Sequence, residues 1–139
     1  MAESSLTPLP RKLGIKPGQR LLFVGAPPGF IGAVAPLPQG TQRIDEGQQG
    51  DGLDLIVLFA IDRAEMEWHL RELAQRLAPS GGLWVAWPKK ASGVATDLSD
   101  DVVRAAGLAL GLVDNKICSI DSTWSAQRFV FRLRDRPKR

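Results

Sequence analysis

The chain has 139 residues, of which 44% are hydrophobic and 24% are charged, so its length and composition predict one packed globular domain and exclude wholesale disorder. Because nucleic-acid binding usually needs a clustered basic stripe, and no such stripe is visible in the sequence, we expect no nucleic-acid partner. Part of the formal net charge of +3 instead lies in the C-terminal tail, at Arg132, Arg134, Arg136, Lys138 and Arg139.

Cysteine and histidine usage and the hydropathy pattern exclude further classes of protein. The single cysteine, Cys118, cannot form an internal disulfide, and together with the single histidine, His69, it leaves no set of ligands spaced for zinc. Residues 1–14 lack the apolar core of a secretory signal. No apolar run approaches the roughly 20 residues that cross a bilayer. We therefore expect a soluble, cytoplasmic protein with no metal site and no membrane segment.

The first part of the chain predicts an arm followed by three strands. Residues 1–12 are expected to form a flexible N-terminal arm, because two prolines limit regular structure there. The apolar run 20–25 ends in glycine and predicts a buried parallel strand. Residues 30–34 allow one or two helical turns before further prolines stop them, and 41–44 predict a weak strand. The strongest strand of the chain covers 54–60.

Two amphipathic helices are predicted in the second part of the chain. Asp62 can cap the first, whose apolar stripe runs from Met66 to Leu77 before Pro79 ends it. Ser99 can cap the second, which carries two aspartates in its first turn. The buried face of this second helix is expected to comprise Val102, Val103, Ala106 and Leu110.

Three further strands complete a predicted sheet. Residues 83–87 form one strand, and the runs 112–121 and 128–134 predict an antiparallel hairpin because only a short bend separates them. Strands that alternate with helices indicate right-handed crossovers and a parallel sheet. The predicted fold class is therefore α/β: a three-layer, Rossmann-like, mostly parallel sheet with a C-terminal antiparallel hairpin. One domain is expected to span 13–134, before a basic tail at 135–139.

Several stretches of the sequence resemble known proteins. Residues 13–25 resemble the lead into the first strand of class I S-adenosylmethionine-dependent methyltransferases, and residues 70–82 resemble the helix and turn before their fifth strand. The whole chain is similar to a small bacterial family catalogued as a domain of unknown function. The resemblance implies a shortened methyltransferase-like core with the third strand missing. The stretches that carry the similarity to the bacterial family are 22–30, 83–93, 111–118 and 121–125.

The resemblance implies a cofactor site at the first glycine-rich turn. Gly25 and Gly29 match the outer glycines of the methyltransferase loop, and Asp45 is the acidic candidate for the ribose of S-adenosylmethionine. Pro27, however, replaces the middle glycine, which removes an N–H and adds bulk. Only residues 46–53 separate the second predicted strand from the third, so the helix and strand that wall the adenine are missing. We therefore predict no cofactor, or weak binding of S-adenosylmethionine.

Polar residues at the carboxyl edge of the predicted sheet form a second candidate site. Ligands of open α/β sheets bind outside the carboxyl ends of the parallel strands. The loop after residue 87 offers Lys89, Lys90 and Ser92, and the hairpin bend beside it offers Trp124, whose indole can stack on a planar ligand. We expect a small anionic or nucleotide-like ligand there, the alternative being a solvated loop.

Trp68 projects from its helix on the side opposite the apolar stripe. An indole in that position is expected to pack under a loop or at the contact of a homodimer, because aromatic residues are enriched in interfaces.

Two functions of different classes remain open. The first is a non-catalytic binding or regulatory module on a degenerate methyltransferase-like fold, with an unidentified small anion or a protein as its partner. The second is a minimal S-adenosylmethionine-dependent methyltransferase or nucleotide-using enzyme. Pro27 and the missing third strand favour the first. No G-x-S-x-G nucleophile elbow is present, so we do not expect a hydrolase, and the sequence assigns no catalytic residue.

Overall fold

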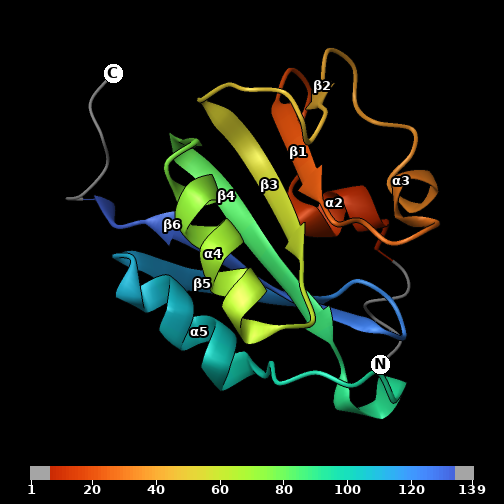
Figure 1. The fold of residues 1–139 in the computed structure, drawn as a ribbon. Helices are drawn as coiled ribbons and strands as arrows, with labels where there is room; N and C mark the ends of the chain where they lie inside the picture. Colours follow the sequence, from red (N-terminus) through yellow and green to blue (C-terminus); the bar gives the residue numbers. More distant parts are fainter. Residues whose placement is uncertain (1–6, 134–139) are drawn as a thin grey trace.

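A six-stranded mixed sheet forms the centre of the protein (Figure 1). The computed structural model describes residues 7–133. The strand order is β2-β1-β3-β4-β6-β5; the first four strands are mutually parallel, and β6 is antiparallel to both of its neighbours. The strands are β1 (Arg20–Val24), β2 (Gln42–Ile44), β3 (Leu53–Phe59), β4 (Leu77–Pro88), β5 (Leu112–Ser119) and β6 (Trp124–Phe131).

This strand order confirms the predicted topology. The predicted central strands are β1, β3 and β4, and the antiparallel hairpin lies at one side of the sheet. Within the described residues β2 is the edge strand, so no third methyltransferase strand lies beyond it. The hairpin bend is shorter than predicted. Asp121 Oδ1 accepts hydrogen bonds from the backbone N of Thr123 at 2.8 Å and of Trp124 at 2.9 Å, and this tight turn allows β6 to begin at Trp124 instead of residue 128.

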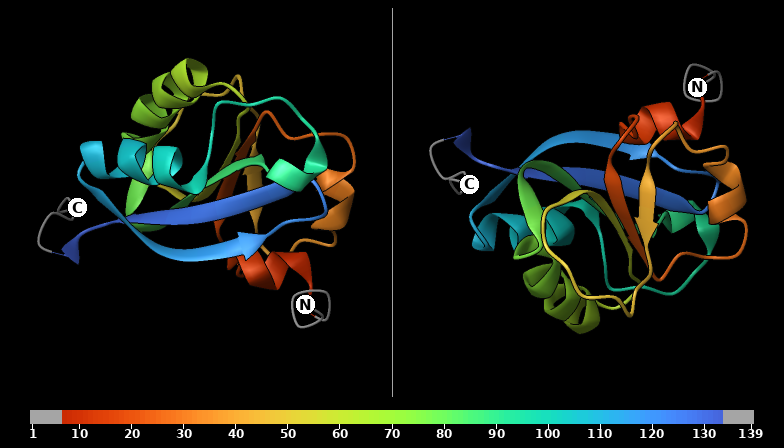
Figure 2. Two further views of the ribbon diagram at one scale, coloured as in Figure 1. Left: turned by 90° about the horizontal axis from the view of Figure 1, so that it is seen from below. Right: turned by 90° about the horizontal axis from the view of Figure 1, so that it is seen from above.

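Helices cover the two faces of the sheet (Figure 2). One face packs against α4 (Arg63–Ala74) and α5 (Asp100–Ala109), and the other against α2 (Leu9–Leu13) and the single turn α3 (Phe30–Ala33). Because side chains alternate along a strand, each buried strand contributes to both apolar clusters. Leu22, Ile56 and Val85 belong to the cluster of α4 and α5, whereas Leu21, Val57 and Trp84 belong to that of α2 and α3.

The two long helices begin where the sequence predicts. Asp62 Oδ2 accepts a hydrogen bond from the N of Glu65 at 2.8 Å, and Ser99 Oγ accepts one from the N of Val102 at 3.3 Å. None of the helices described is both long and apolar enough to span a bilayer. The predicted burial of Leu110 is wrong. Leu110 lies past the end of α5 and is 36% exposed.

The predicted end of α4 is also wrong. Leu77 does not close the helix; it begins β4 and pairs with Leu53. The next pair joins Gly82 to Leu55, so β4 carries extra residues that bulge out of the ladder. A Cβ on Gly81 would lie 2.9 Å from the carbonyl oxygens of Leu53 and Asp54. Pro79 and the glycines therefore shape a bulge in β4, whereas the sequence pattern suggested a loop before a short strand at 83–87.

Residues 9–13 form a helix, although residues 9–12 lie within the predicted flexible arm. Pro10 occupies the first turn of α2, where a backbone N–H has no intrahelical partner to lose. Leu13 is fully buried, and its carbonyl accepts a hydrogen bond from Trp84 Nε1 at 2.9 Å. Residues 1–6 of the arm and the basic tail 135–139 lie outside the described residues.

Candidate functional site

The carboxyl ends of β1, β3 and β4 meet at one edge of the sheet, where the arrowheads of Figure 1 point. The turn after β1 contains the two predicted glycines. Gly25 has a φ of +70°, and a Cβ there would lie 3.0 Å from the carbonyl oxygen of Phe59. Gly29, with a φ of +91°, precedes α3. Glycine is therefore required at residue 25 by the close approach of β3 as well as by its backbone conformation.

Glu46 reaches the glycine turn. The backbone N of Gly25 donates a hydrogen bond to Oε2 of Glu46 at 3.1 Å. The predicted acid, Asp45, lies beside it on an exposed turn, where its own backbone N donates to Oε1 of Gln48 at 2.8 Å. Both acids follow the end of β2 at Ile44, and Glu46 lies in a turn. No signal in the sequence distinguishes the acid that reaches Gly25 from its neighbour.

The loop between β2 and β3 lies over β1 on the side of α4. Arg76 donates to the carbonyls of Gly50 at 2.7 Å and Gln48 at 3.0 Å, and Arg20 donates to the carbonyl of Asp51 at 2.6 Å. A pocket of about 390 Å³ remains between this loop, β1 and α4.

Two features of this edge differ from the S-adenosylmethionine site that the resemblance implies. Glu46 already occupies the hydrogen-bond donor of the glycine turn, and Pro27 offers no N–H in its place. The wall on which an adenine would rest is absent from the described residues, since the sheet ends at β2. No group of three or more His, Cys, Asp or Glu side chains in the described chain is arranged to hold a metal ion.

The lysine loop lies where the sequence predicts, at the end of β4. The turn Lys90–Ser92 is 3₁₀-helical, and the backbone N of Lys89 donates to the carbonyl of Thr123 at 2.7 Å, which ties the loop to the hairpin bend. Lys89 Nζ donates to Oγ of Ser119 at 2.5 Å. Lys89 and Lys90 line a pocket of about 660 Å³ that extends to the start of α5.

The other two predicted ligand residues have internal roles. Ser92 Oγ donates to the carbonyl of Lys89 at 2.6 Å and accepts from the N of Val94 at 3.2 Å. Trp124 pairs with Pro88 in the ladder, so it is adjacent to the lysine loop in register. Its indole, however, packs edge-on against Phe59, with ring centroids 5.1 Å apart, in the apolar cluster of α2 and α3. The geometry brings Lys89 and Lys90 together and directs the Trp124 ring away from them.

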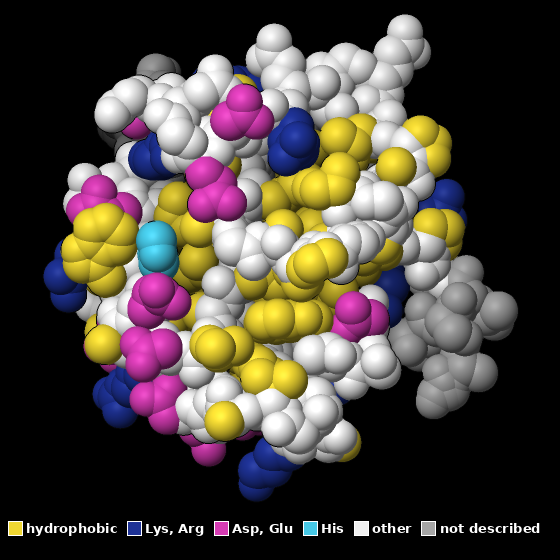
Figure 3. All heavy atoms as spheres, turned by 45° about the vertical axis from the view of Figure 1, so that its right-hand side comes forward, with side chains coloured by type: hydrophobic (Ala, Val, Ile, Leu, Met, Phe, Trp, Pro, Cys, Tyr) yellow, Lys and Arg dark blue, Asp and Glu magenta, His cyan; other side chains and the backbone are white. Residues whose placement is uncertain are grey.

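Trp68 is 60% exposed and packs edge-on against His69, with ring centroids 5.0 Å apart. Both residues border the pocket under the β2–β3 loop. Figure 3 shows that apolar side chains gather in the middle of one face of the molecule, with Asp and Glu side chains along its left border. The exposure of the Trp68 side chain confirms that it lies off the apolar stripe of its helix, whereas its predicted role in a homodimer stays a prediction.

No protein-family model matches the sequence, and no match to a curated protein was found. Solved structures do match. A SAM-dependent methyltransferase from Aquifex aeolicus is similar, with a TM-score of 0.63 and 13% identity over 86% of this chain and 85% of that chain. Magnesium protoporphyrin IX methyltransferase from Synechocystis PCC 6803 with bound SAH gives a TM-score of 0.57 and 11% identity, over 84% of this chain and 75% of that chain.

A third match is a chain from a protein complex. It comes from the complex between the Haloferax volcanii Trm112 methyltransferase activator and the putative methyltransferase, with a TM-score of 0.62 and 12% identity over 93% of this chain and 88% of that chain. Identities this low show the fold alone. The sheet order and these matches together show that the chain has a Rossmann-like core of the class I SAM-dependent methyltransferase type.

Proposed function

We propose that this protein is a non-catalytic binding or regulatory module built on a methyltransferase fold. The observation that carries the proposal is the hydrogen bond from Gly25 N to Glu46, through which the chain itself fills the donor that the glycine turn would offer to a cofactor. A carboxylate bound to a backbone N–H makes a charge-assisted hydrogen bond, so a cofactor must first displace it.

The ligand that we propose for the module is a small anion at the end of β4, held by Lys89 and Lys90. The pocket of about 660 Å³ beside them has the size of a small-molecule site, and its lining also includes the hydroxyl of Ser99 and the carboxylate of Asp100. A protein partner is the other candidate, supported by the similarity to a chain from a complex with a methyltransferase activator.

The competing function is a minimal S-adenosylmethionine-dependent methyltransferase. Two observations favour it. One of the similar solved structures, magnesium protoporphyrin IX methyltransferase, has bound SAH. This chain also has a glycine at residue 25 and acidic residues directly after β2. Glu46 is exposed, so its side chain has room to leave Gly25.

Calorimetry with S-adenosylmethionine and SAH separates the two functions. We expect no binding in the micromolar range by the wild type. The competing function predicts micromolar binding that Asp45→Ala weakens and that Glu67→Ala preserves, because Glu67 is an exposed acid of α4 paired with Arg63. Micromolar binding with that pattern of loss would overturn the proposal.

A further inference from the structure

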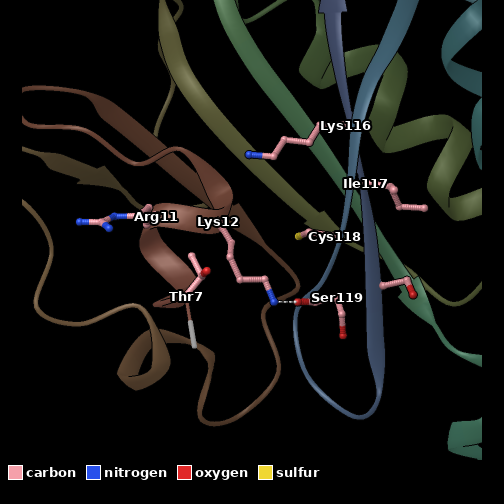
Figure 4. A pocket seen from close by; sticks show the side chains of 8 residues that line it. Thr7, Arg11, Lys12, Lys116, Ile117, Cys118 and Ser119 are labelled. Atoms are coloured by element: carbon pink, nitrogen blue, oxygen red, sulfur yellow. Dashed lines mark hydrogen bonds between the residues drawn. The ribbon is translucent and has the colours of Figure 1, made fainter. Parts of the chain in front are cut away.

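A pocket of about 590 Å³ lies at the free edge of β5, away from the glycine turn (Figure 4). Helix α2 forms one side of it and β5 forms the other. Lys12 reaches across the gap, and its Nζ donates to the carbonyl oxygen of Ser119. In Figure 4 the side chains of Lys116 and Cys118 extend from β5 toward α2, whereas Arg11 points away from the gap.

Positive charge dominates this pocket. Lys12, Lys116 and Arg11 contribute to its lining, and no Asp or Glu of the described part of the chain does. Within residues 7–133 the two ion pairs are Arg63–Glu67 and Arg104–Asp114, so none of the three cations of the pocket is neutralised by an ion pair.

A third ammonium group, that of Lys89, lies close to Ser119 at the end of β5. Lys89 Nζ donates to Oγ of Ser119, whose carbonyl accepts from Lys12. The field of these charges reaches the Cys118 thiol at the side of the pocket. Burial raises the pKa of this thiol, and Lys12, Lys116 and Lys89 each act to lower it. Like charges repel one another, here the half-buried Lys12 and Lys89 and the exposed Lys116, and an anion placed between them relieves that repulsion.

We propose that this pocket binds a small molecule that carries a phosphate monoester, with the phosphate between Lys12 and Lys116. Lysine ammonium groups bind phosphate as point charges through charge-assisted hydrogen bonds, and the hydroxyl of Thr7 adds a donor. The volume falls within the usual range for sites of nucleotide-sized ligands, about 300–1,000 Å³. Lys89 contacts this site through Ser119 but lines only the pocket of the lysine loop, so the two sites are distinct pockets and the test below changes neither Lys89 nor Lys90.

The alternative is that the lysines only guard the free edge of β5 against pairing with another strand. An edge guard works by projecting its charge into water. Lys116 on β5 is exposed and could serve in that way, but Lys12 is half-buried, comes from a different element, and lies in a concave space with hydroxyl groups and a thiol. The two roles differ in one measurable respect, which is whether the pocket takes up an anion.

Cys118 is the chain's one cysteine, so its alkylation by iodoacetamide reports on this pocket alone. At matched ionic strength, inorganic phosphate and AMP should slow alkylation in a saturable manner, and adenosine should not. Lys116→Met, which removes a side chain with no hydrogen bond among the described residues, should raise the apparent Kd at least about tenfold. Lys12→Met/Lys116→Met should abolish protection.

The matched control is Arg43→Met/Arg71→Met, which removes the same net charge from β2 and α4, outside the lining of this pocket. Protection should be unchanged in this variant. The proposal is overturned if AMP gives no protection at millimolar concentration, or if protection survives in Lys12→Met/Lys116→Met. It is also overturned if a short single-stranded RNA protects far better than AMP at equal phosphate concentration, since the ligand would then be a polyanion.

Discussion

Gly107 offers a sharp test of how the helices are seated on the sheet. A Cβ at this position of α5 would lie 2.2 Å from Cε1 and 2.4 Å from Cδ1 of Phe129, against about 3.5–4.0 Å for carbon atoms in contact. Phe129 is fully buried in β6, so its ring has little room to withdraw. Gly107→Ala should therefore overpack the core at a cost of about 3 kcal/mol, the upper end for such changes.

Alanine is the better helix former by about 1 kcal/mol, so we expect a net loss of about 2 kcal/mol, or about 6–8 °C in Tm for a domain of this size. The matched control is Gly32→Ala in α3, where a Cβ would meet no atom within 4 Å. Urea unfolding should show a loss for Gly107→Ala and no loss for the control. Phe129→Leu should reduce the cost of Gly107→Ala in a double-mutant cycle. Equal stability of wild type and Gly107→Ala would refute the packing described for α5.

Three further predictions concern the surface and the thiol. The variant Lys89→Ala/Lys90→Ala should have a Tm within about 3 °C of the wild type, because the Lys89 hydrogen bond contributes about 1 kcal/mol or less. The same variant should show no calorimetric binding of any anion that a ligand screen places at this loop. An anion that still binds to the variant would refute that site. If the protein self-associates, Trp68→Arg should give a monomer in sedimentation, and an unchanged oligomer would place the contact elsewhere. Burial raises the pKa of the Cys118 thiol, so as the pH rises the thiol of the unfolded chain is deprotonated before that of the folded chain. The free energy of unfolding should therefore fall as the pH rises through the thiol pKa of the unfolded chain, and should level off above the thiol pKa of the folded chain. Urea unfolding should show this fall in the wild type and a smaller one in Cys118→Ala.

The central strands and the starts of the long helices could be predicted because their signals are local. The apolar run of β3 and the caps Asp62 and Ser99 specify structure without reference to the rest of the chain. The bulge in β4 could not be predicted. Residue 81 must be glycine because a Cβ there would lie 2.9 Å from the carbonyl oxygens of Leu53 and Asp54, and those atoms belong to a neighbouring strand.

The candidate sites divide in the same way. Pro88 ends β4 and places Lys89 and Lys90 at the sheet edge, which the sequence pattern predicted. The direction of the Trp124 ring depends on which face of β6 meets Phe59, and a one-residue difference in register would reverse it. The basic pocket at β5 was missed altogether. Lys12 and Ser119 are separated by 107 positions, and Lys12 was assigned to an arm without structure.

The loss of the third strand explains both the closed glycine turn and the shape of the β2 edge. In a sheet that ends at β2, the side chains of Leu22 and Val24 would face water on the side of α4 unless another segment covered them. The loop from β2 to β3 provides that cover, held by Arg76 and Arg20 through its backbone carbonyls. The same loop carries Glu46 to Gly25. The same loop therefore covers the apolar side chains of β1 and occupies the backbone donor of the glycine turn. A variant that moves this loop away from Gly25 should also have a lower free energy of unfolding. Arg76→Met tests this coupling: its unfolding free energy should fall by about 1–3 kcal/mol, because two hydrogen bonds to a charged group are lost. If Arg76→Met leaves stability unchanged, the loop does not cover the core in the way described.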